Sequence, residues 1–164
     1  MTIASTAILQ GPVIIGANTE IRPGAYIRGN VITGESCIIG NSTELKNCIL
    51  LDFVQVPHYN YIGDSILGNH SHMGASAICS NLKSDGSNVT VRRRNDNFSI
   101  ETGLRKFGAI IGDHSEIGCG SVLNPGTIIG KSTSVYPLVP VRGIIPGNSI
   151  VKSSEVIVVR QKEK

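Results

Sequence analysis

The sequence predicts an all-β fold, a parallel β-helix built from six-residue repeats, and three observations indicate it. Aliphatic side chains recur at every sixth position over two long stretches of the chain. The residue after the aliphatic one is often glycine, and the fourth residue after it is small or β-branched. A six-residue period fits neither an α-helix nor a long alternating strand, whereas a short strand followed by a tight turn satisfies it.

The aliphatic series predicts the interior of the solenoid. Apart from one threonine its members are aliphatic: Ile3, Leu9, Ile15, Ile21, Ile27, Thr33, Ile39, Leu45 and Leu51, then Ile111, Ile117, Leu123, Ile129, Val135 and Val141. Three repeats would close one triangular coil of about eighteen residues. The alternative is an ordinary β-sandwich in which the spacing is coincidental.

The small series predicts the residues that fit inside the corners of each coil. It contains Ala7, Val13, Thr19, Ala25, Val31, Cys37 and Thr43, then Ser115, Ser121, Thr127, Thr133 and Val139. The glycines that follow the aliphatic positions are Gly16, Gly34, Gly40, Gly112, Gly118 and Gly130. Glycine tolerates the dihedral angles of tight turns, which supports the assignment.

Two interruptions of the period mark where functional groups are expected. The register slips over residues 53–61 and resumes at Leu67, Met73 and Cys79. Residues 81–106 are polar, lack the period and contain consecutive arginines at 92–94, which indicates a loop or short hairpin projecting from the solenoid. We therefore expect one domain over residues 1–159, with a last strand within 149–159, and a flexible tail over 160–164.

Composition and charge exclude several classes of protein. The net charge of +3 is mild and does not indicate nucleic-acid binding. The N-terminus lacks the features of a signal peptide, and no apolar stretch is long enough to cross a membrane. The 4 cysteines form no Cys-x-x-Cys pair. We expect them to be reduced thiols in a cytoplasmic protein, with disulfides as the alternative.

Four segments carry a more specific likeness. They read RPGAYIRG from Arg22, STELKNC from Ser42, VPHYNYIGDSILG from Val56 and HMGASAICSNLKSDG from His72. In order and spacing they resemble the hexapeptide-repeat acyltransferases, in particular the acetyltransferase domain of bifunctional N-acetylglucosamine-1-phosphate uridyltransferase/glucosamine-1-phosphate acetyltransferase. The chain is also similar to stand-alone proteins related to UDP-N-acetylglucosamine pyrophosphorylase. The likeness covers about residues 10–145.

The resemblance implies a left-handed β-helix, a homotrimer with sites between subunits, and acetyl-CoA as co-substrate, with no metal. His58 matches the general base. Four residues match groups that bind a sugar phosphate or nucleotide sugar: Arg22, Lys46, Tyr61 and Asn81. Cys119 and Arg142 fall at the acetyl-CoA site, where Cys119 replaces a serine. The implied activity is N-acetylation of an amino-sugar phosphate such as glucosamine-1-phosphate, or of a nucleotide-linked sugar.

The chain departs from the family pattern at two site positions. Leu82 replaces the tyrosine expected after Asn81, and His72 replaces an asparagine. The sequence also contains no nucleotidyltransferase domain, so no uridylyl transfer is expected of this chain. A second hypothesis is therefore a catalytically silent module that binds a sugar nucleotide or mediates oligomerisation.

The residues themselves are compatible with acetyl transfer. A neutral histidine is a good base for an attacking amine near pH 7, and His58 follows a proline within a register slip. From position alone, a histidine that satisfies a buried turn carbonyl is an equal alternative. A third hypothesis is a zinc-dependent hydratase similar to carbonic anhydrase, using His58 with the outward-facing His70 and His72, although their spacing does not match that family.

Overall fold

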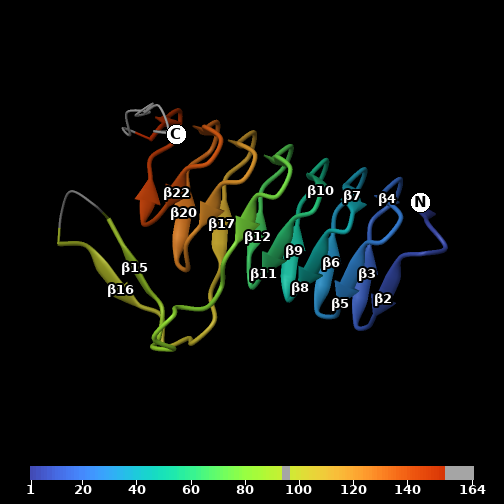
Figure 1. The fold of residues 1–164 in the computed structure, drawn as a ribbon, viewed down its shortest axis with the longest axis horizontal. Helices are drawn as coiled ribbons and strands as arrows, with labels where there is room; N and C mark the ends of the chain where they lie inside the picture. The colour runs from blue at the N-terminus through green and yellow to red at the C-terminus, as the bar shows by residue number, and fades with distance from the viewer. Residues whose placement is uncertain (94–96, 154–164) are drawn as a thin grey trace, which may run out of the picture.

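The computed structural model describes residues 1–93 and 97–153, which form a left-handed parallel β-helix of triangular cross-section (Figure 1). Three parallel sheets, named A, B and C here, make the sides of the prism, and each full coil contributes one strand to each sheet. The predicted fold class is confirmed. The corners are named A/B, B/C and C/A after the sheets that they join.

The strands of each sheet stack in chain order. Sheet A has 8 strands: β1 (Thr2–Ile3), β4 (Glu20–Ile21), β7 (Ile38–Asn41), β10 (Gln55–His58), β13 (His72–Met73), β18 (Glu116–Ile117), β21 (Ser134–Val135) and β24 (Ile150–Val151). Sheet B has 7 strands: β2 (Ile8–Gln10), β5 (Tyr26–Arg28), β8 (Glu44–Lys46), β11 (Tyr61–Gly63), β14 (Ile78–Cys79), β19 (Val122–Leu123) and β22 (Pro140–Val141). Sheet C has 7 strands: β3 (Val13–Ile15), β6 (Val31–Thr33), β9 (Cys48–Leu50), β12 (Ile66–Leu67), β17 (Ala109–Ile111), β20 (Thr127–Ile129) and β23 (Ile144–Ile145).

The interior is the aliphatic ladder that the period predicts. Ile21, Ile39 and Leu45 are at most 1% exposed, and Ile117 and Leu123 are equally buried in the later coils. The small series lines the inside of the corners, where residues such as Thr19, Thr43, Ser115, Ser121, Thr127 and Thr133 are fully buried. Their hydroxyls donate to backbone carbonyls of the next coil, so the buried polar atoms are satisfied.

The first interruption of the repeat lies earlier than expected. Leu51 is 38% exposed, and Leu50 takes the interior position that the period assigned to Leu51. The B/C corner contains both Gly29 and Asn30 in the second coil but only Asn47 in the third, all with positive φ, so the third coil is one residue shorter. Residues 53–61 therefore make a regular corner and strand, with Val54 and Val56 buried, and not a break.

The second interruption is an insertion between β14 and β17 that carries an antiparallel hairpin, β15 (Thr90–Arg92) and β16 (Ser99–Glu101). Figure 1 shows this hairpin projecting from the side of the solenoid near its C-terminal coils. Val89 and Val91 are buried at its base, where the chain passes close to Gly126 at the B/C corner. Arg94 and the expected tail over 160–164 lie outside the described residues, as does most of the last strand expected within 149–159.

All 4 cysteines are free, with Cys37, Cys48 and Cys79 buried in the core and Cys119 exposed. Desolvation by burial raises the pKa of the Cys48 and Cys79 thiols to about 12. Within residues 1–93 and 97–153, no helix is long and apolar enough to cross a membrane.

Candidate active site

Three of the predicted site residues lie together on the outer face of sheet B. Lys46 ends β8 and Tyr61 begins β11, and both point outward because the strand alternation turns Leu45 and Ile62 into the core. Asn81 follows β14 by two residues, at the start of the insertion, and is 9% exposed. Consecutive coils thus place the Lys46 ammonium, the Tyr61 phenol and the Asn81 amide on one surface.

Asp64, at the B/C corner, connects these three residues. Its carboxylate accepts hydrogen bonds from the Asn47 amide (2.6 Å) and from Asn81 Nδ2. Lys46 Nζ lies 3.7 Å from Asp64 Oδ2, and the Asp64 side chain is only 10% exposed. Asn81 Nδ2 also donates to the Tyr61 hydroxyl at 3.2 Å. We call Lys46, Tyr61, Asp64 and Asn81 the sheet B cluster.

Gly63 is needed for the cluster to close. A Cβ atom at this position would lie 2.6 Å from the Tyr61 hydroxyl oxygen and 2.7 Å from Asn81 Nδ2. Any other residue would therefore separate the phenol from the amide. Gly63 lies beside Lys46 in the sheet register, and the space that a side chain at Gly63 would need is filled by the Tyr61 hydroxyl and the Asn81 amide.

The Tyr61 hydroxyl is a neutral donor at physiological pH. Desolvation by burial raises the pKa of Tyr61, and the hydrogen bond from Asn81 lowers it by a smaller amount. Since its oxygen accepts from Asn81, the hydroxyl proton can be donated to a ligand.

His58 lies apart from the sheet B cluster, at the A/B corner. Its backbone N–H donates to Asn60 Oδ1 at 3.1 Å, and Tyr59 between them has a φ of 53°. The buried Asn60 amide in turn donates to Gly74 O (2.8 Å) and Ala77 O (3.1 Å) of the next coil. This anchored turn exposes the His58 ring, which has no partner among the residues that the structure describes. The alternative of a ring bound to a buried carbonyl is therefore wrong.

The remaining predicted site residues are dispersed. Arg22 follows β4 on the outside of sheet A and pairs with Glu20 at 3.2 Å. Cys119 lies at the A/B corner like His58, and backbone hydrogen bonds through Ser76 and Gly120 place it two coils further on. Arg142 lies on the outside of sheet B near Asn124 Oδ1 (3.5 Å). One chain does not bring these residues into contact with the sheet B cluster.

A polar hollow contains Arg142. It has a volume of about 350 Å³ and lies between the outer face of sheet B and the first turn of the insertion. Lys83 and Asn124 also line it. The Lys83 ammonium is held by the Ser87 hydroxyl (2.5 Å) and the Asn88 carbonyl (3.2 Å). Asp85 also lines the hollow, and its Oδ2 lies 3.9 Å from Lys83 Nζ, so Arg142 is the cation there without a carboxylate partner among residues 1–93 and 97–153.

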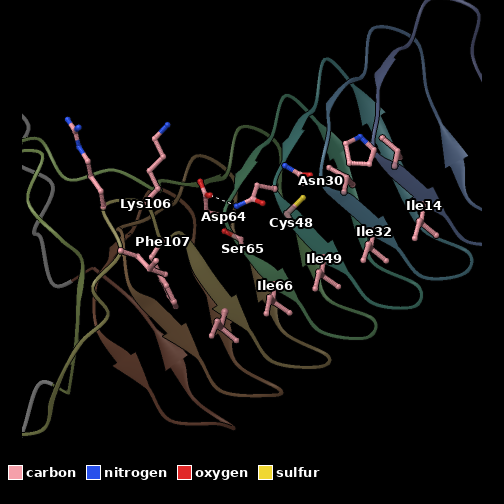
Figure 2. Close-up of a pocket in the computed structure, with 17 residues that line it drawn as sticks. Ile14, Asn30, Ile32, Cys48, Ile49, Asp64, Ser65, Ile66, Lys106 and Phe107 are labelled. Atoms are coloured by element: carbon pink, nitrogen blue, oxygen red, sulfur yellow. Dashed lines mark hydrogen bonds between the residues drawn. The ribbon is translucent and has the colours of Figure 1, made fainter.

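The outer face of sheet C has the opposite character, because isoleucines from successive coils pair with one another along the sheet. This isoleucine ladder contains Ile14, Ile32, Ile49, Ile66, Ile110, Ile128 and Ile144. Figure 2 shows Ile14, Ile32, Ile49 and Ile66 in one row, with Asp64 and Lys106 across the groove. The groove has a volume of about 850 Å³ and is walled by residues 104–107 of the insertion.

Comparison with known proteins identifies the family. Residues 9–98, more than half of the 164-residue chain, match the model of the GMPPB C-terminal domain. The chain belongs to the GMPPB C-terminal domain family. The uncharacterized acetyltransferase YaiX of Escherichia coli is 34% identical over 165 residues, which cover 90% of this chain and 71% of the relative.

Other relatives are more than twice as long as this chain. The bifunctional protein GlmU of Methanococcus aeolicus is 34% identical over 180 residues, which cover 99% of this chain but only 43% of the relative. The chain thus spans less than half the length of that protein. The predicted resemblance to the acetyltransferase part of such bifunctional enzymes is confirmed.

Solved structures share the fold. A UDP-N-acetylglucosamine acyltransferase from Francisella novicida superimposes with a TM-score of 0.62 at 16% identity, over 92% of this chain and 62% of that one. A perosamine N-acetyltransferase from Caulobacter crescentus, solved with CoA and GDP-perosamine, gives a TM-score of 0.51 at 19% identity, over 90% of this chain and 50% of that one. The left-handed β-helix of this family member is therefore that of hexapeptide-repeat acyltransferases.

His58, His70 and His72, the histidines of the zinc hypothesis, do not form one cluster. His70 stacks between Phe53 and His114 at the C/A corner, with ring centroids 4.5 and 4.9 Å away. His72 Nδ1 lies 2.8 Å from Glu116 Oε2 on sheet A. Among residues 1–93 and 97–153, no group of three or more histidine, cysteine or acidic side chains could hold a metal ion.

The sequence prediction missed two residues that organise the site. Asp64 lies inside the VPHYNYIGDSILG segment that contains His58 and Tyr61, so its place in that segment was the available signal. Asn60 takes an inward corner position where other coils have Thr43 or Ala77, and a buried asparagine in the small series was a signal as well.

Proposed function

We propose that the chain transfers the acetyl group of acetyl-CoA to the amine of an amino-sugar phosphate such as glucosamine-1-phosphate, with a nucleotide-linked amino sugar as the other acceptor class. The sheet B cluster carries this proposal. It joins a cation, a phenolic donor and an oriented amide on the face adjoining the His58 corner, and these groups suit a phosphorylated sugar.

In the proposed reaction His58 is the general base. The amine attacks the thioester carbonyl, a C–N bond forms and the C–S bond breaks. The imidazole accepts the proton that the amine must lose and passes it to the departing thiolate, so CoA leaves as the thiol. An exposed ring held on a rigid turn can approach such an amine, and this role is assigned to His58 by its place in the family motif.

Acetyl-CoA is the proposed co-substrate, with no resident metal. Cys119 and Arg142 are assigned to it by their positions in the family pattern. The polar hollow contains the Arg142 guanidinium, which suits a negative charge of CoA, whereas Lys83 in the same hollow is paired with Asp85 at 3.9 Å. The free thiols fit a reducing compartment, so we expect the protein to act in the cytoplasm.

A homotrimer is proposed because a single chain has an incomplete site and an uncovered apolar face. His58 lies at the A/B corner, apart from the sheet B cluster, and we expect a neighbouring copy to close a site around both. The isoleucine ladder leaves a row of apolar side chains on the outside of sheet C, including Ile14 at 63% and Ile32 at 44% exposure. Apolar patches of this kind mark interaction surfaces.

The activity is tested by thiol release from acetyl-CoA over a panel of amino-sugar 1-phosphates and nucleotide-linked amino sugars. Mass spectrometry then identifies the N-acetylated product. We expect turnover with at least one acceptor and a loss of about 10²–10⁴-fold in His58→Ala. The matched control is His114→Ala, which changes a histidine at the C/A corner. No turnover with any acceptor would contradict the proposal.

The trimer is tested by light scattering after size-exclusion chromatography. Ile49→Glu places a charge in the middle of the isoleucine ladder, and we expect it to yield monomers. Ile8→Glu is the control, because Ile8 is 58% exposed on the outside of sheet B. A wild-type monomer, or a trimer unaffected by Ile49→Glu, would contradict the assignment.

The alternative is the catalytically silent binding module. It is favoured by Leu82, which is 41% exposed where the family pattern has a tyrosine. Tight binding of a sugar nucleotide without acetyl transfer would support this alternative.

A further inference from the structure

The Asp64 carboxylate is more buried and has more hydrogen-bond partners than a corner residue of the solenoid needs for the fold. At the equivalent place one coil earlier the chain has Asn47, which is exposed, whereas the Asp64 side chain is 10% exposed. Its two carboxylate oxygens accept from two different amides, one from the preceding coil and one from the insertion. Because a carboxylate can only accept, both amides must turn their NH₂ groups toward it.

This constraint fixes the orientation of the Asn81 amide. Both hydrogens of Asn81 Nδ2 are used, one by Asp64 and the other by the Tyr61 hydroxyl. Asn81 Oδ1 has no hydrogen-bond partner among residues 1–93 and 97–153, and although Asn81 is only 9% exposed, this oxygen is not fully buried. The carbonyl oxygen of Asn81 is therefore the atom offered to a ligand.

The sheet B cluster thus has a defined polarity. It offers an acceptor at Asn81 Oδ1, a donor at the Tyr61 hydroxyl and a cation at Lys46, whose charge Asp64 partly balances at 3.7 Å. A ligand that fits must present a donor to Asn81, an acceptor to Tyr61 and a negative charge near Lys46. Sugar hydroxyls satisfy the first two requirements, and a phosphate satisfies the third.

We propose that Asp64 is a positioning residue that sets the specificity of this site. Asp64 holds the Asn81 amide with its oxygen outward, and the site therefore selects acceptor sugars that place a hydroxyl donor opposite Asn81 Oδ1. This assignment rests on the proposed function, since it names the polarity of the acceptor half of the same site. Asp64 acts through Asn81 and Lys46 and does not touch the substrate.

The test is Asp64→Asn, which keeps the shape of the side chain and replaces one acceptor by a donor. The introduced amide cannot accept from both neighbouring amides, so Asn81 loses its fixed orientation. We expect the dissociation constant for glucosamine-1-phosphate, measured by calorimetry, to rise by about tenfold or more. In turnover, KM for the acceptor rises equally, while kcat and KM for acetyl-CoA stay within about twofold.

A second variant separates positioning from folding. The double variant combines Asp64→Asn with Asn81→Asp and so reverses the hydrogen bond between the two positions. The introduced amide donates to the introduced carboxylate, and an oxygen again faces the ligand. We expect this variant to bind the acceptor more tightly than the two single effects combined predict. The control Asp52→Asn changes an exposed carboxylate that accepts the Glu35 N–H (2.8 Å) at the C/A corner, and binding should not change.

The outcomes distinguish the two proposals. Wild-type affinity in Asp64→Asn, or equal losses of kcat and affinity with no recovery in the double variant, would overturn the role of Asp64 and leave the proposed function standing. A wild-type protein that binds none of the amino-sugar phosphates would overturn the proposed function and the assignment with it.

Discussion

Replacing Asn60 by alanine tests whether a buried amide anchors the His58 corner. Asn60 is 2% exposed, its Oδ1 accepts the His58 N–H, and its Nδ2 donates to Gly74 O and Ala77 O. Alanine fits this position sterically, since Ala77 takes it in the next coil. The substitution therefore removes hydrogen bonds without overpacking the corner.

The expected loss of stability follows from the groups left without partners. Gly74 O also accepts the Ala77 N–H (3.1 Å), so it keeps a partner. The His58 N–H and the Ala77 carbonyl lose theirs, and each orphaned group costs about 1–3 kcal/mol. We expect Asn60→Ala to lower the free energy of unfolding by about 2–6 kcal/mol.

Urea unfolding at fixed protein concentration measures this loss, and thiol release measures its effect on catalysis. A loosened corner should also reduce kcat, since the His58 backbone is no longer held. Asn60→Thr introduces the residue found one coil earlier, Thr43, and should lose less. If Asn60→Ala unfolds within about 0.5 kcal/mol of wild type, the buried amide does not anchor the corner.

Two further predictions concern the cysteines. Ellman's reagent should modify Cys119 alone in the folded protein, because Cys119 is the exposed thiol. Acetyl-CoA should slow this reaction. Modification of more than one thiol, or an unchanged rate with acetyl-CoA, would contradict the prediction. The Cys48 and Cys79 thiols have their pKa raised from 9.0 to about 12, so above pH 9 the unfolded chain releases protons that the folded chain keeps. Stability should therefore fall with rising pH in that window, by up to about 1.4 kcal/mol per pH unit for each thiol, and urea titrations of Cys79→Ala should show a shallower fall.

The fold could be predicted because its interior repeats with a fixed period. One aliphatic and one small residue per six suffice to place Ile21, Ile39 and Leu45 in the core and Thr43 at a corner. The one-residue shortening at Asn47 escaped prediction, because Leu50 and Leu51 are equally apolar and only the number of corner residues distinguishes them.

The site was predictable residue by residue but not as an arrangement. Tyr61, Lys46 and Asn81 follow from the motif, whereas their contact with Asp64 depends on the coil register and on the entry of the insertion. His58 and Arg22 belong to the same pattern but lie on other parts of the prism, which sequence order alone does not reveal.

Chemical rescue of the proposed base tests the assigned role of His58. Acetyl transfer from acetyl-CoA to an amino-sugar 1-phosphate is measured for wild type and His58→Ala, with and without added imidazole. We expect turnover by wild type, a loss of at least about 100-fold in the variant, and partial recovery with imidazole in the variant only. A variant as active as wild type, or one that imidazole does not restore, would contradict the assignment of His58 as general base.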